Sequence, residues 1–184
     1  YTLATWLCGR SITRLSARLE RSTSRRELDD SCSVLAELDN GGSALMTASI
    51  VSVGFQREQQ LRVFGTKGSL EWSSSSSKTL LTRLLGNAIK VYNLDLNRAE
   101  LPASVATYPL DASLPNLHAT MEREVRRRRG EEGPAAYPHP GALHGVQAMR
   151  FLEAVVASSE NSSDWVEVGA VAGKAMAWLC WEIG

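Results

Sequence analysis

The sequence predicts an α+β fold, a predominantly antiparallel open β-sheet in meander order with helices packed on one face. Residues 31–73 contain short segments in which apolar and polar residues alternate, and the turns between them are too short for parallel pairing. Segments with helical spacing are grouped towards the end of the chain. A doubly wound fold is disfavoured because neither βαβ alternation nor a GxGxxG motif occurs.

The first thirty residues predict a short helix, a strand and a loop. Leu3, Ala4, Trp6 and Leu7 share the spacing of one helix face, and Gly9 is a natural stop. Residues 12–20 alternate as a strand does, with a slip of phase between Ile12 and Leu15. Residues 21–30 are polar and are predicted to form a loop.

The meander itself is predicted from alternation and turn residues. Apolar Cys32, Val34, Ala36 and Leu38 alternate with more polar neighbours, and residues 39–42, Asp-Asn-Gly-Gly, suit a tight hairpin turn. Further strands are expected over residues 45–53, 59–64 and 69–73, with a turn at 65–68. Trp72 ends the last of them, and we expect it to be largely buried against the helices.

Both faces of the strand over 45–53 are unusually apolar. One face carries Leu45, Thr47, Ser49, Val51 and Val53, and the other carries Ala44, Met46, Ala48 and Ile50. Helices can cover only one of these faces. We therefore expect the sheet to pair with a second copy of itself and form a homo-oligomer.

The remaining chain is predicted to alternate loops with strands and helices. Ser73–Ser77 is expected to be a flexible loop, 79–85 and 89–94 strands, and 98–115 irregular. Leu114, Leu117, Met121 and Val125 define a helix face, followed by four arginines, 126–129, at the helix end. Residues 131–141 form a loop by composition, 142–158 a helix, 161–164 a turn, 165–168 an extended segment and 169–183 a second long helix.

The arginine run has two interpretations, a solvated helix end or an anion or nucleic-acid patch. The helix end is favoured because no interleaved aromatic residues are present. The 184 residues contain 20 Lys and Arg against 20 Asp and Glu, so no net field favours nucleic acid or an acidic membrane. No run is long enough to span a membrane, and no signal peptide is seen at the start. A cytoplasmic location is the default expectation.

Metal and disulfide chemistry are not indicated. The sequence has three cysteines, Cys8, Cys32 and Cys180. Their number is odd, they are widely spaced and they form no CxxC pair, so we interpret them as small buried apolar residues. The histidines and carboxylates show no metal-binding spacing, and no P-loop or serine-nucleophile turn occurs.

One stretch resembles a known family. Three segments carry the resemblance: Leu28-Asp29-Asp30, Asn40-Gly41-Gly42 and residues 61–72, Leu-Arg-Val-Phe-Gly-Thr-Lys-Gly-Ser-Leu-Glu-Trp. They resemble the C-terminal domain of Gfo/Idh/MocA-type oxidoreductases. The resemblance is weakest over residues 87–134. It implies that residues 1–184 are a single C-terminal domain for substrate binding and oligomerisation. It also implies a partner, an N-terminal Rossmann domain of the same chain, with a small carbohydrate-like substrate.

The resemblance implies what the parent enzyme does and what this chain lacks. The parent would use NAD or NADP to oxidise or reduce a sugar, polyol or related alcohol. The family's catalytic lysine and histidine fall before Tyr1, the histidine by about two residues, so no catalytic or cofactor-binding residue is assigned here. We expect this chain to be part of a longer protein and, alone, to be inactive and to bind no NAD(P).

Candidate substrate-binding residues are His139, Tyr137 and His144. Tyr137-Pro138-His139-Pro140-Gly141 resembles the family's His-Pro-x-Gly stretch, which precedes a long helix and lies near the substrate. Where typical members continue with Glu-Gly and an aromatic residue, this chain has Gly141-Ala142-Leu143. A different interpretation remains open, in which the chain is a non-catalytic module that assembles through its sheet. His118 is expected to be structural or exposed.

Overall fold

The computed structural model describes residues 1–24, 26–54, 58–76, 78–93, 113–131 and 140–169. The chain separates by its internal contacts into two compact units, Tyr1–Gln56 with Pro140–Gly184 and Arg57–His139. Each unit contains one antiparallel, four-stranded sheet. The α+β class predicted from the sequence is therefore confirmed, and a single domain over residues 1–184 stays a prediction.

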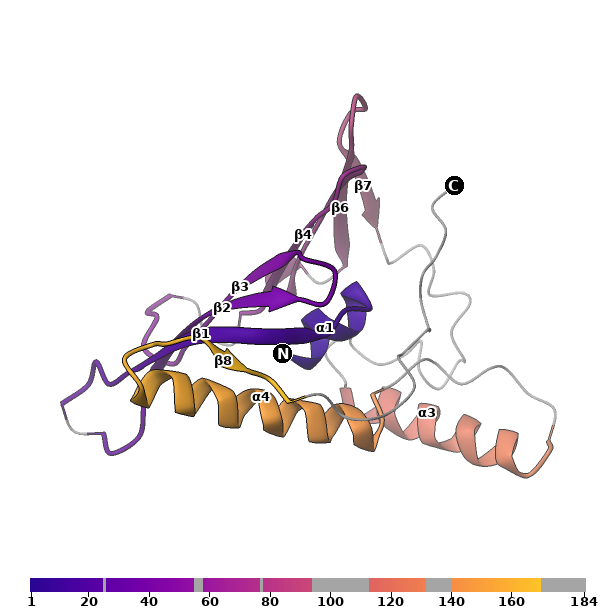
Figure 1. Cartoon of the computed structure of the whole chain (residues 1–184). Helices are drawn as coiled ribbons and strands as arrows, with labels where there is room; N and C mark the ends of the chain where they lie inside the picture. Colours follow the sequence, from indigo (N-terminus) through magenta and orange to yellow (C-terminus); the bar gives the residue numbers. More distant parts are fainter. Residues whose placement is uncertain (25, 55–57, 77, 94–112, 132–139, 170–184) are drawn as a thin grey trace. The chain divides into compact units, whose positions relative to one another are not determined.

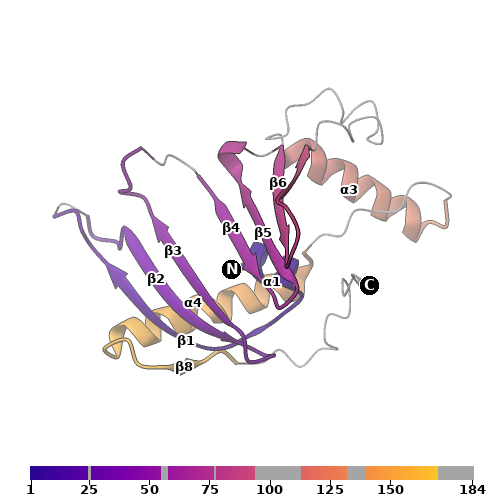
Figure 2. The ribbon, with the colours of Figure 1, turned by 90° about the horizontal axis from the view of Figure 1, so that it is seen from above.

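The first sheet has the strand order β3-β2-β1-β8. Its strands are β1 (Ile12–Glu20), β2 (Ser31–Leu38), β3 (Ser43–Ser49) and the short β8 (Val166–Glu167). Helix α1 (Thr2–Cys8) precedes β1, and helix α4 (Ala142–Glu160) lies along one face of the sheet (Figures 1 and 2). Gly9 follows α1 with φ of 60° and Gly41 turns the β2–β3 hairpin with φ of 80°, so both predicted stops are confirmed.

The hydrophobic core of this unit lies between α4 and the sheet. Leu15 and Ala36 have no exposed surface. The strands contribute every second residue to the core and the helix contributes one stripe, as the period of each element requires. Among the described residues, the buried apolar ones are Ile12, Leu15, Ala17, Val34, Ala36, Phe151, Ala154 and Val155.

The phase slip expected in β1 is confirmed as a bulge. Ile12 pairs with Leu38 and Arg14 with Glu37, so two steps along β1 match one step along β2. Ile12, Leu15 and Ala17 are all buried, although simple alternation cannot place Ile12 and Leu15 on one face. The extra residue in the strand brings both side chains to the core.

Two serines of α4 complete the edge of β1 beyond the short strand β8. The Ala17 N–H donates to Ser158 Oγ at 2.8 Å, and the Leu19 N–H donates to Ser159 Oγ at 2.9 Å. Ser158 Oγ in turn donates to the Asp164 carbonyl at 2.6 Å. A buried N–H without a partner is costly, so these hydroxyls take the place of the strand that β8 is too short to supply.

The second sheet has the order β4-β5-β6-β7. Its strands are β4 (Gln60–Phe64), β5 (Gly68–Ser73), β6 (Thr79–Leu84) and β7 (Lys90–Asn93). The unit also contains a single 3-10 turn, η1 (Ser74–Ser76), and helix α3 (Ser113–Arg128). The predicted strands over 79–85 and 89–94 and the predicted helix that ends near Gly130 are confirmed.

The structure explains why position 68 of the sequence motif is a glycine. A Cβ at this position would lie 2.2 Å from the Arg83 carbonyl oxygen of β6. Gly65 and Gly68 bond to each other across the turn, with the Gly65 N–H 2.8 Å from the Gly68 carbonyl. Glycine is therefore required where β5 leaves the hairpin and approaches β6.

Three sequence-based expectations need correction. The meander is not one sheet, because β3 ends at Ser49 and the strand pairing resumes separately from β4 onwards. The strand predicted over 45–53 spans Ser43–Ser49, so Ile50–Val53 lie outside it. The serine run is not a structureless loop, since Ser74–Ser76 form η1 and bond to the segment before β4. Alternation alone does not reveal where a strand stops pairing.

Trp72 is partly buried, and its burial against the helices stays a prediction. On α3, Met121 and Val125 are exposed although they lie on the predicted apolar face. The arginines that follow are matched by acids of the same segment: Arg126 contacts Glu122 at 2.6 Å, and Arg127 and Arg128 both contact Glu124 at 2.8 Å. The run is therefore a paired helix end. The predicted helix over 169–183 and Cys180 lie outside the described residues.

Candidate functional site

Only one of the three predicted substrate-binding residues lies within the described residues. His139 and Tyr137 fall in the range 132–139, which is outside them. His144 is in the first turn of α4, at the third helical position after Gly141, which precedes the helix in an extended conformation with φ of −98°. The site is therefore built here from His144 and the elements that position it.

His144 uses one ring nitrogen to cap its own helix. The Gly141 N–H donates to His144 Nδ1 at 2.9 Å, and the His144 N–H donates back to the Gly141 carbonyl at 3.0 Å. This is half of a capping box, in which the third residue of a helix accepts from the backbone of the residue before it. An Nδ1 that accepts a hydrogen bond carries no proton, so the neutral ring carries its proton on Nε2.

His144 also lies on the stripe of α4 that faces the sheet. Phe151, Val155 and Ser158, all buried, follow it at seven, eleven and fourteen residues. The side chain is half-buried, and Nε2 is shielded from solvent with no hydrogen-bond partner among the described residues. Nδ1 is therefore occupied by its exposed bond to the Gly141 N–H, and Nε2 is buried.

The start of the chain packs against the same helix. The Tyr1 ring lies over Phe151, with centroids 4.7 Å apart and planes 32° from parallel. Burial raises the pKa of the Tyr1 hydroxyl, and a hydrogen bond with Thr5 opposes that shift. Phe151 is seven residues from His144, about 10 Å along a helix. Tyr1, which precedes α1, therefore contacts α4 about two helical turns after His144.

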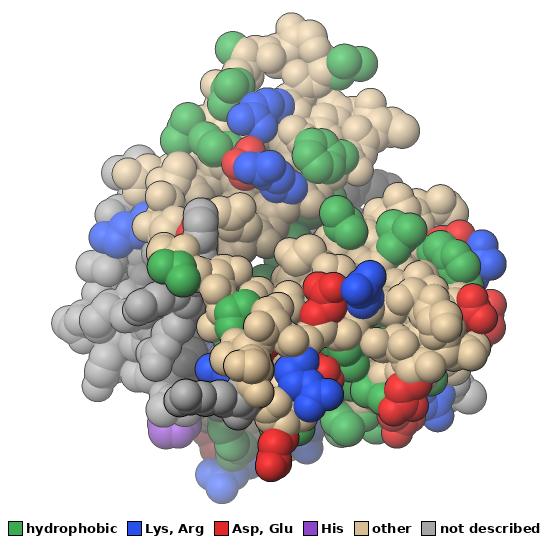
Figure 3. All heavy atoms as spheres, turned by 90° about the vertical axis from the view of Figure 1, so that its left-hand side faces the viewer, with side chains coloured by type: hydrophobic (Ala, Val, Ile, Leu, Met, Phe, Trp, Pro, Cys, Tyr) green, Lys and Arg blue, Asp and Glu red, His purple; other side chains and the backbone are tan. Residues whose placement is uncertain are grey.

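The face of the first sheet opposite α4 combines apolar and charged residues. Leu35 and Leu45 are directly opposite each other on β2 and β3, and they are 46% and 77% exposed. Hydrophobic and charged side chains also lie side by side on the surface seen in Figure 3.

Next to these leucines, a charged pair and an aromatic ring lie on the same face. Arg14 forms two hydrogen bonds with Glu37, at 2.8 and 2.7 Å, and its guanidinium lies 4.8 Å from the Trp165 ring centre. The hydrogen bond from Arg14 lowers the pKa of Glu37. The two-point bond holds the Arg14 side chain in one orientation.

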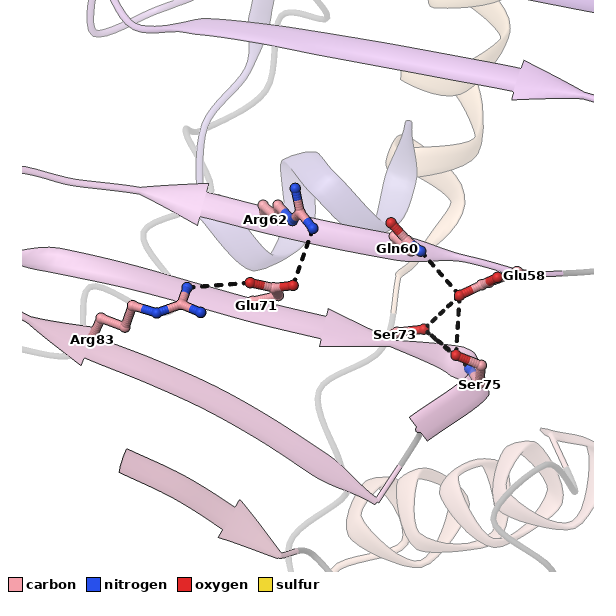
Figure 4. Close-up of polar contacts among 7 residues, drawn as sticks. All are labelled: Glu58, Gln60, Arg62, Glu71, Ser73, Ser75 and Arg83. Atoms are coloured by element: carbon pink, nitrogen blue, oxygen red, sulfur yellow. Dashed lines mark hydrogen bonds and ion pairs between the residues drawn. The ribbon is translucent and has the colours of Figure 1, made fainter. Parts of the chain in front are cut away.

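One face of the second sheet carries a series of polar contacts (Figure 4). The Glu71 carboxylate on β5 accepts from Arg62 on β4 and from Arg83 on β6, each at 3.2 Å. Its pKa is lowered, mainly by the bond from Arg83. The carboxylate therefore links three neighbouring strands through charge.

A second carboxylate lies at the end of the same sheet. Glu58 Oε1 accepts from Gln60, Ser73 and Ser75, each at 3.0 Å (Figure 4). These bonds lower the pKa of Glu58, the one from Gln60 most. These bonds also explain why the serine run is ordered. Its hydroxyl groups donate to the Glu58 carboxylate, which lies outside the run and cannot be inferred from the composition of the run.

Sequence reasoning missed two buried polar residues. Asp30 is 3% exposed and accepts the backbone N–H groups of Ser22 and Thr23, both at 2.9 Å. Ser158 is fully buried within the apolar stripe of α4. A polar residue at a core position of a helix is a signal that could have revealed Ser158, whereas Asp30 ends a polar loop and gives no such signal.

No metal or cofactor site emerges from the described residues. Within them, no group of three or more His, Cys, Asp or Glu side chains is close enough to hold a metal ion. Cys8 and Cys32 are half-buried thiols whose pKa is raised by burial. His118 is exposed on α3. In the parts of the chain that are described, no helix is long and apolar enough to cross a membrane.

Comparisons with known proteins show which family the chain resembles. The model of the GFO/IDH/MocA C-terminal domain matches residues 1–71. An uncharacterised oxidoreductase of Bacillus subtilis (strain 168), YfiI, is 26% identical over 153 residues, which are 78% of this chain and 39% of that protein. The resemblance inferred from the sequence is thus confirmed, and the relative is an oxidoreductase.

Several solved structures share the fold of this chain. An oxidoreductase from Sinorhizobium meliloti matches with a TM-score of 0.76 and 26% identity, over 90% of this chain and 49% of that one. An inositol dehydrogenase homologue from Azotobacter vinelandii, in complex with NAD+, has the same fold, with a TM-score of 0.61, 22% identity and coverage of 90% and 45%. Levoglucosan dehydrogenase, in complex with NADH and levoglucosan, matches with a TM-score of 0.69, 17% identity and coverage of 92% and 48%. The chain spans about half the length of these proteins or less.

Proposed function

We propose, from the match of residues 1–71 to the Gfo/Idh/MocA C-terminal domain, that this chain is the substrate-side half of an NAD(P)-dependent oxidoreductase. The enzyme moves a hydride between the nicotinamide and a carbon of a sugar, polyol or related alcohol. The cofactor supplies the redox chemistry, and the protein positions the two reactants. The dinucleotide belongs to a Rossmann domain that lies outside this chain.

One structural observation adds to the sequence match: the Tyr1 ring packs on Phe151 of α4. In the family that the chain resembles, the catalytic histidine precedes the position of Tyr1 by about two residues. With Tyr1 held against α4, we propose that the position of this family histidine is close to α4.

The substrate class follows from the chemistry of the structural neighbours and of these side chains. One inositol dehydrogenase homologue is in complex with NADH and myo-inositol, and levoglucosan dehydrogenase is in complex with NADH and levoglucosan. A histidine and a tyrosine offer donors and acceptors to hydroxyl groups without bringing a fixed charge. We propose His139 and Tyr137 as hydroxyl-binding residues at the edge of the substrate pocket of the whole enzyme.

A turnover assay tests the proposal. The enzyme in which this chain is joined to its dinucleotide domain is incubated with NAD or NADP and a panel of polyols and sugars that includes myo-inositol and levoglucosan. Formation of NADH or NADPH, followed by absorbance, is the expected result. His139→Ala is expected to lower kcat/KM without lowering the melting temperature, and the exposed Leu152→Ala on α4 is the matched control. No reduction with any compound would overturn the proposal.

A second function, assembly through the first sheet, is favoured by the exposed Leu35–Leu45 pair. Apolar residues opposite each other on a sheet face are suited to a second copy of the same face. This property is compatible with catalysis, and it is the whole function if the chain is a non-catalytic module.

Light scattering at tens of micromolar tests the assembly proposal. The chain is expected to be a dimer or larger, and Leu45→Lys is expected to shift it towards the monomer, because a lysine cannot be buried there without a partner. Leu152→Lys places the same charge on the exposed side of α4 and should leave the assembly unchanged. A monomeric parent chain would contradict this proposal.

A further inference from the structure

We propose that Asn40 is a site of covalent self-modification, at which the backbone nitrogen of Gly41 converts the side-chain amide into aspartate and isoaspartate. Asn40 and Gly41 lie in the exposed hairpin turn between β2 and β3. The reaction needs only water as a co-reactant. Neither the oxidoreductase proposal nor the assembly proposal uses this turn, so the inference stands independently of both.

The reaction proceeds through a cyclic imide. The Gly41 nitrogen loses its proton and attacks Cγ of Asn40, which forms a new C–N bond. The bond between Cγ and the side-chain nitrogen breaks, and that nitrogen leaves as ammonia with the proton. Water then opens the imide at either of its carbonyl groups, and nothing is oxidised or reduced. One opening gives aspartate, and the other gives isoaspartate, in which the main chain runs through the former side chain.

The turn holds the reacting groups close together. The Gly42 N–H donates to Oδ1 of Asn40 at 3.1 Å, so the side chain folds back over the peptide group that contains the Gly41 nitrogen. A hydrogen bond to Oδ1 also stabilises the negative charge that develops on this oxygen during the attack. The Gly42 N–H therefore acts as a donor to the oxyanion that forms on Asn40.

The attacking nitrogen is accessible. Gly41 has φ of 80°, and a Cβ built on it would meet nothing within 4 Å, so the space beside its backbone is open. The Gly41 N–H donates to the Leu38 carbonyl at 3.0 Å, and this bond must open before the nitrogen can attack. The exposed end of a hairpin opens locally at a small cost in free energy. The bond to Leu38 therefore slows the reaction without preventing it.

Asn161 provides a matched comparison in the same unit. It is exposed in the turn after α4, and Ser162 follows it in the chain. Its side-chain nitrogen donates to the Asp164 carboxylate at 3.3 Å, which holds the amide towards that residue. The Ser162 side chain also crowds the nitrogen that would attack, whereas glycine at position 41 does not. Asn161 is therefore expected to react more slowly than Asn40.

The two products are expected to affect the hairpin differently. Isoaspartate lengthens the main chain within the turn that sets the pairing of β2 with β3, in which Glu37 lies opposite Ser43. The register of a hairpin is fixed by its turn, so this product disturbs the ladder. Aspartate retains the normal main chain and adds a charge beside Asp39, whose carboxylate lies 3.9 Å from Arg10. Isoaspartate is therefore the more destabilising product.

Incubation of the 184-residue chain tests the proposal. The chain is kept in mildly alkaline buffer at body temperature, digested, and analysed by mass spectrometry with separation of aspartate and isoaspartate peptides. An aliquot digested before incubation gives the starting level. Asn40 is expected to convert about tenfold faster than Asn161, because the turn holds its reacting groups together. No conversion at Asn40, equal conversion at both asparagines, or aspartate without isoaspartate would overturn the proposal.

Two single substitutions test the contribution of the turn. A Cβ at position 42 would lie 3.0 Å from Oδ1 of Asn40, so Gly42→Ala displaces this oxygen from the N–H that it accepts. Conversion of Asn40 is expected to slow by about fivefold in this variant, through loss of the oxyanion donor. Ser43→Ala is the matched control, because Ser43 is the next residue and is exposed, and it should leave the rate unchanged. A rate in Gly42→Ala that equals or exceeds the parent rate would overturn the role given to the turn.

A longer amide separates the modification from other effects of incubation. Asn40→Gln keeps an amide at the turn but requires a larger ring, so it is expected to remain unmodified. After the same incubation, urea unfolding of the parent is expected to show a second, less stable population, and Asn40→Gln is expected to show none. The same second population in both proteins, or uniform unfolding of a parent sample that contains isoaspartate, would contradict the effect assigned to the modified hairpin.

Discussion

Leu15 of the first sheet has no exposed surface, whereas Leu70, on a comparably internal strand of the second sheet, is 43% exposed. The difference extends to the whole of each described sheet. All fully buried apolar residues among the described residues belong to α4, β1 and β2 of the first unit. In the second unit, the clearest cross-strand contacts are charged and polar ones around Glu71 and Glu58.

This comparison shows that two sheets of equal strand number are stabilised by different means. Burial of apolar area contributes in proportion to the area removed from water, so the first sheet gains most from α4. An exposed ion pair contributes little to the free energy of unfolding, about 0–1 kcal/mol. The first sheet is therefore the stable scaffold that holds α4, and with it His144, in place.

The largest expected effect is on the core of the first sheet. Leu15→Ala is expected to lower the free energy of unfolding by about 2–5 kcal/mol, because it leaves a cavity beneath α4. Leu70→Ala is expected to cost less than about 1 kcal/mol, since its side chain is already partly in water. Urea unfolding of the two variants measures both values. Equal losses would show that the second sheet has a core comparable with the first.

A smaller effect, in the second sheet, is expected from backbone crowding. Gly68→Ala places a methyl group against the Arg83 carbonyl, so β5 and β6 must separate, at a cost of about 1–3 kcal/mol. Gly65→Ala is the matched control, because its nearest contact would be an ordinary 3.7 Å. The melting temperatures of the two variants make the comparison. A harmless Gly68→Ala would mean that the two strands do not approach so closely in solution.

The smallest effect concerns pH and the loop before β2. The pKa of Asp30 is lowered first by the hydrogen bond from the Ser22 backbone and further by the bonds with Thr23. A depressed pKa contributes stability that is present above the unfolded value near 3.8 and is lost as the pH falls through the folded value. Asp30→Asn should flatten the decline in stability below about pH 4. Parallel unfolding curves for parent and variant from pH 5 to pH 2 would count against this role.

The sequence was sufficient for the elements whose side chains alternate or repeat regularly. β1, β2 and α4 appear where the pattern predicts them, and the phase slip at Ile12 is visible before the bulge is known. The division into two sheets was not predictable from alternation, because a strand pattern does not state its partner. The role of Glu58 was hidden for a similar reason, since its serine partners lie fifteen and seventeen residues away.

The candidate site was predictable only in part. Loop composition and family resemblance pointed to His139, Tyr137 and His144, and the structure adds the geometry of the last. The capping bond between the His144 ring and the Gly141 N–H is local, because it joins the third residue of the helix to the residue before the helix. It could have been proposed from the sequence. The burial of Nε2 could not, because it depends on the packing of α4 against the sheet.

Native-state hydrogen exchange tests most directly whether the two sheets are stabilised by different means. Backbone amides paired between β1 and β2 are compared with those paired between β5 and β6, in the same sample of the 184-residue chain. The account predicts slower exchange in the first sheet, by a factor on the order of one hundred, because its opening exposes the core beneath α4. Equal protection of the two sheets, or greater protection of the second, would contradict it.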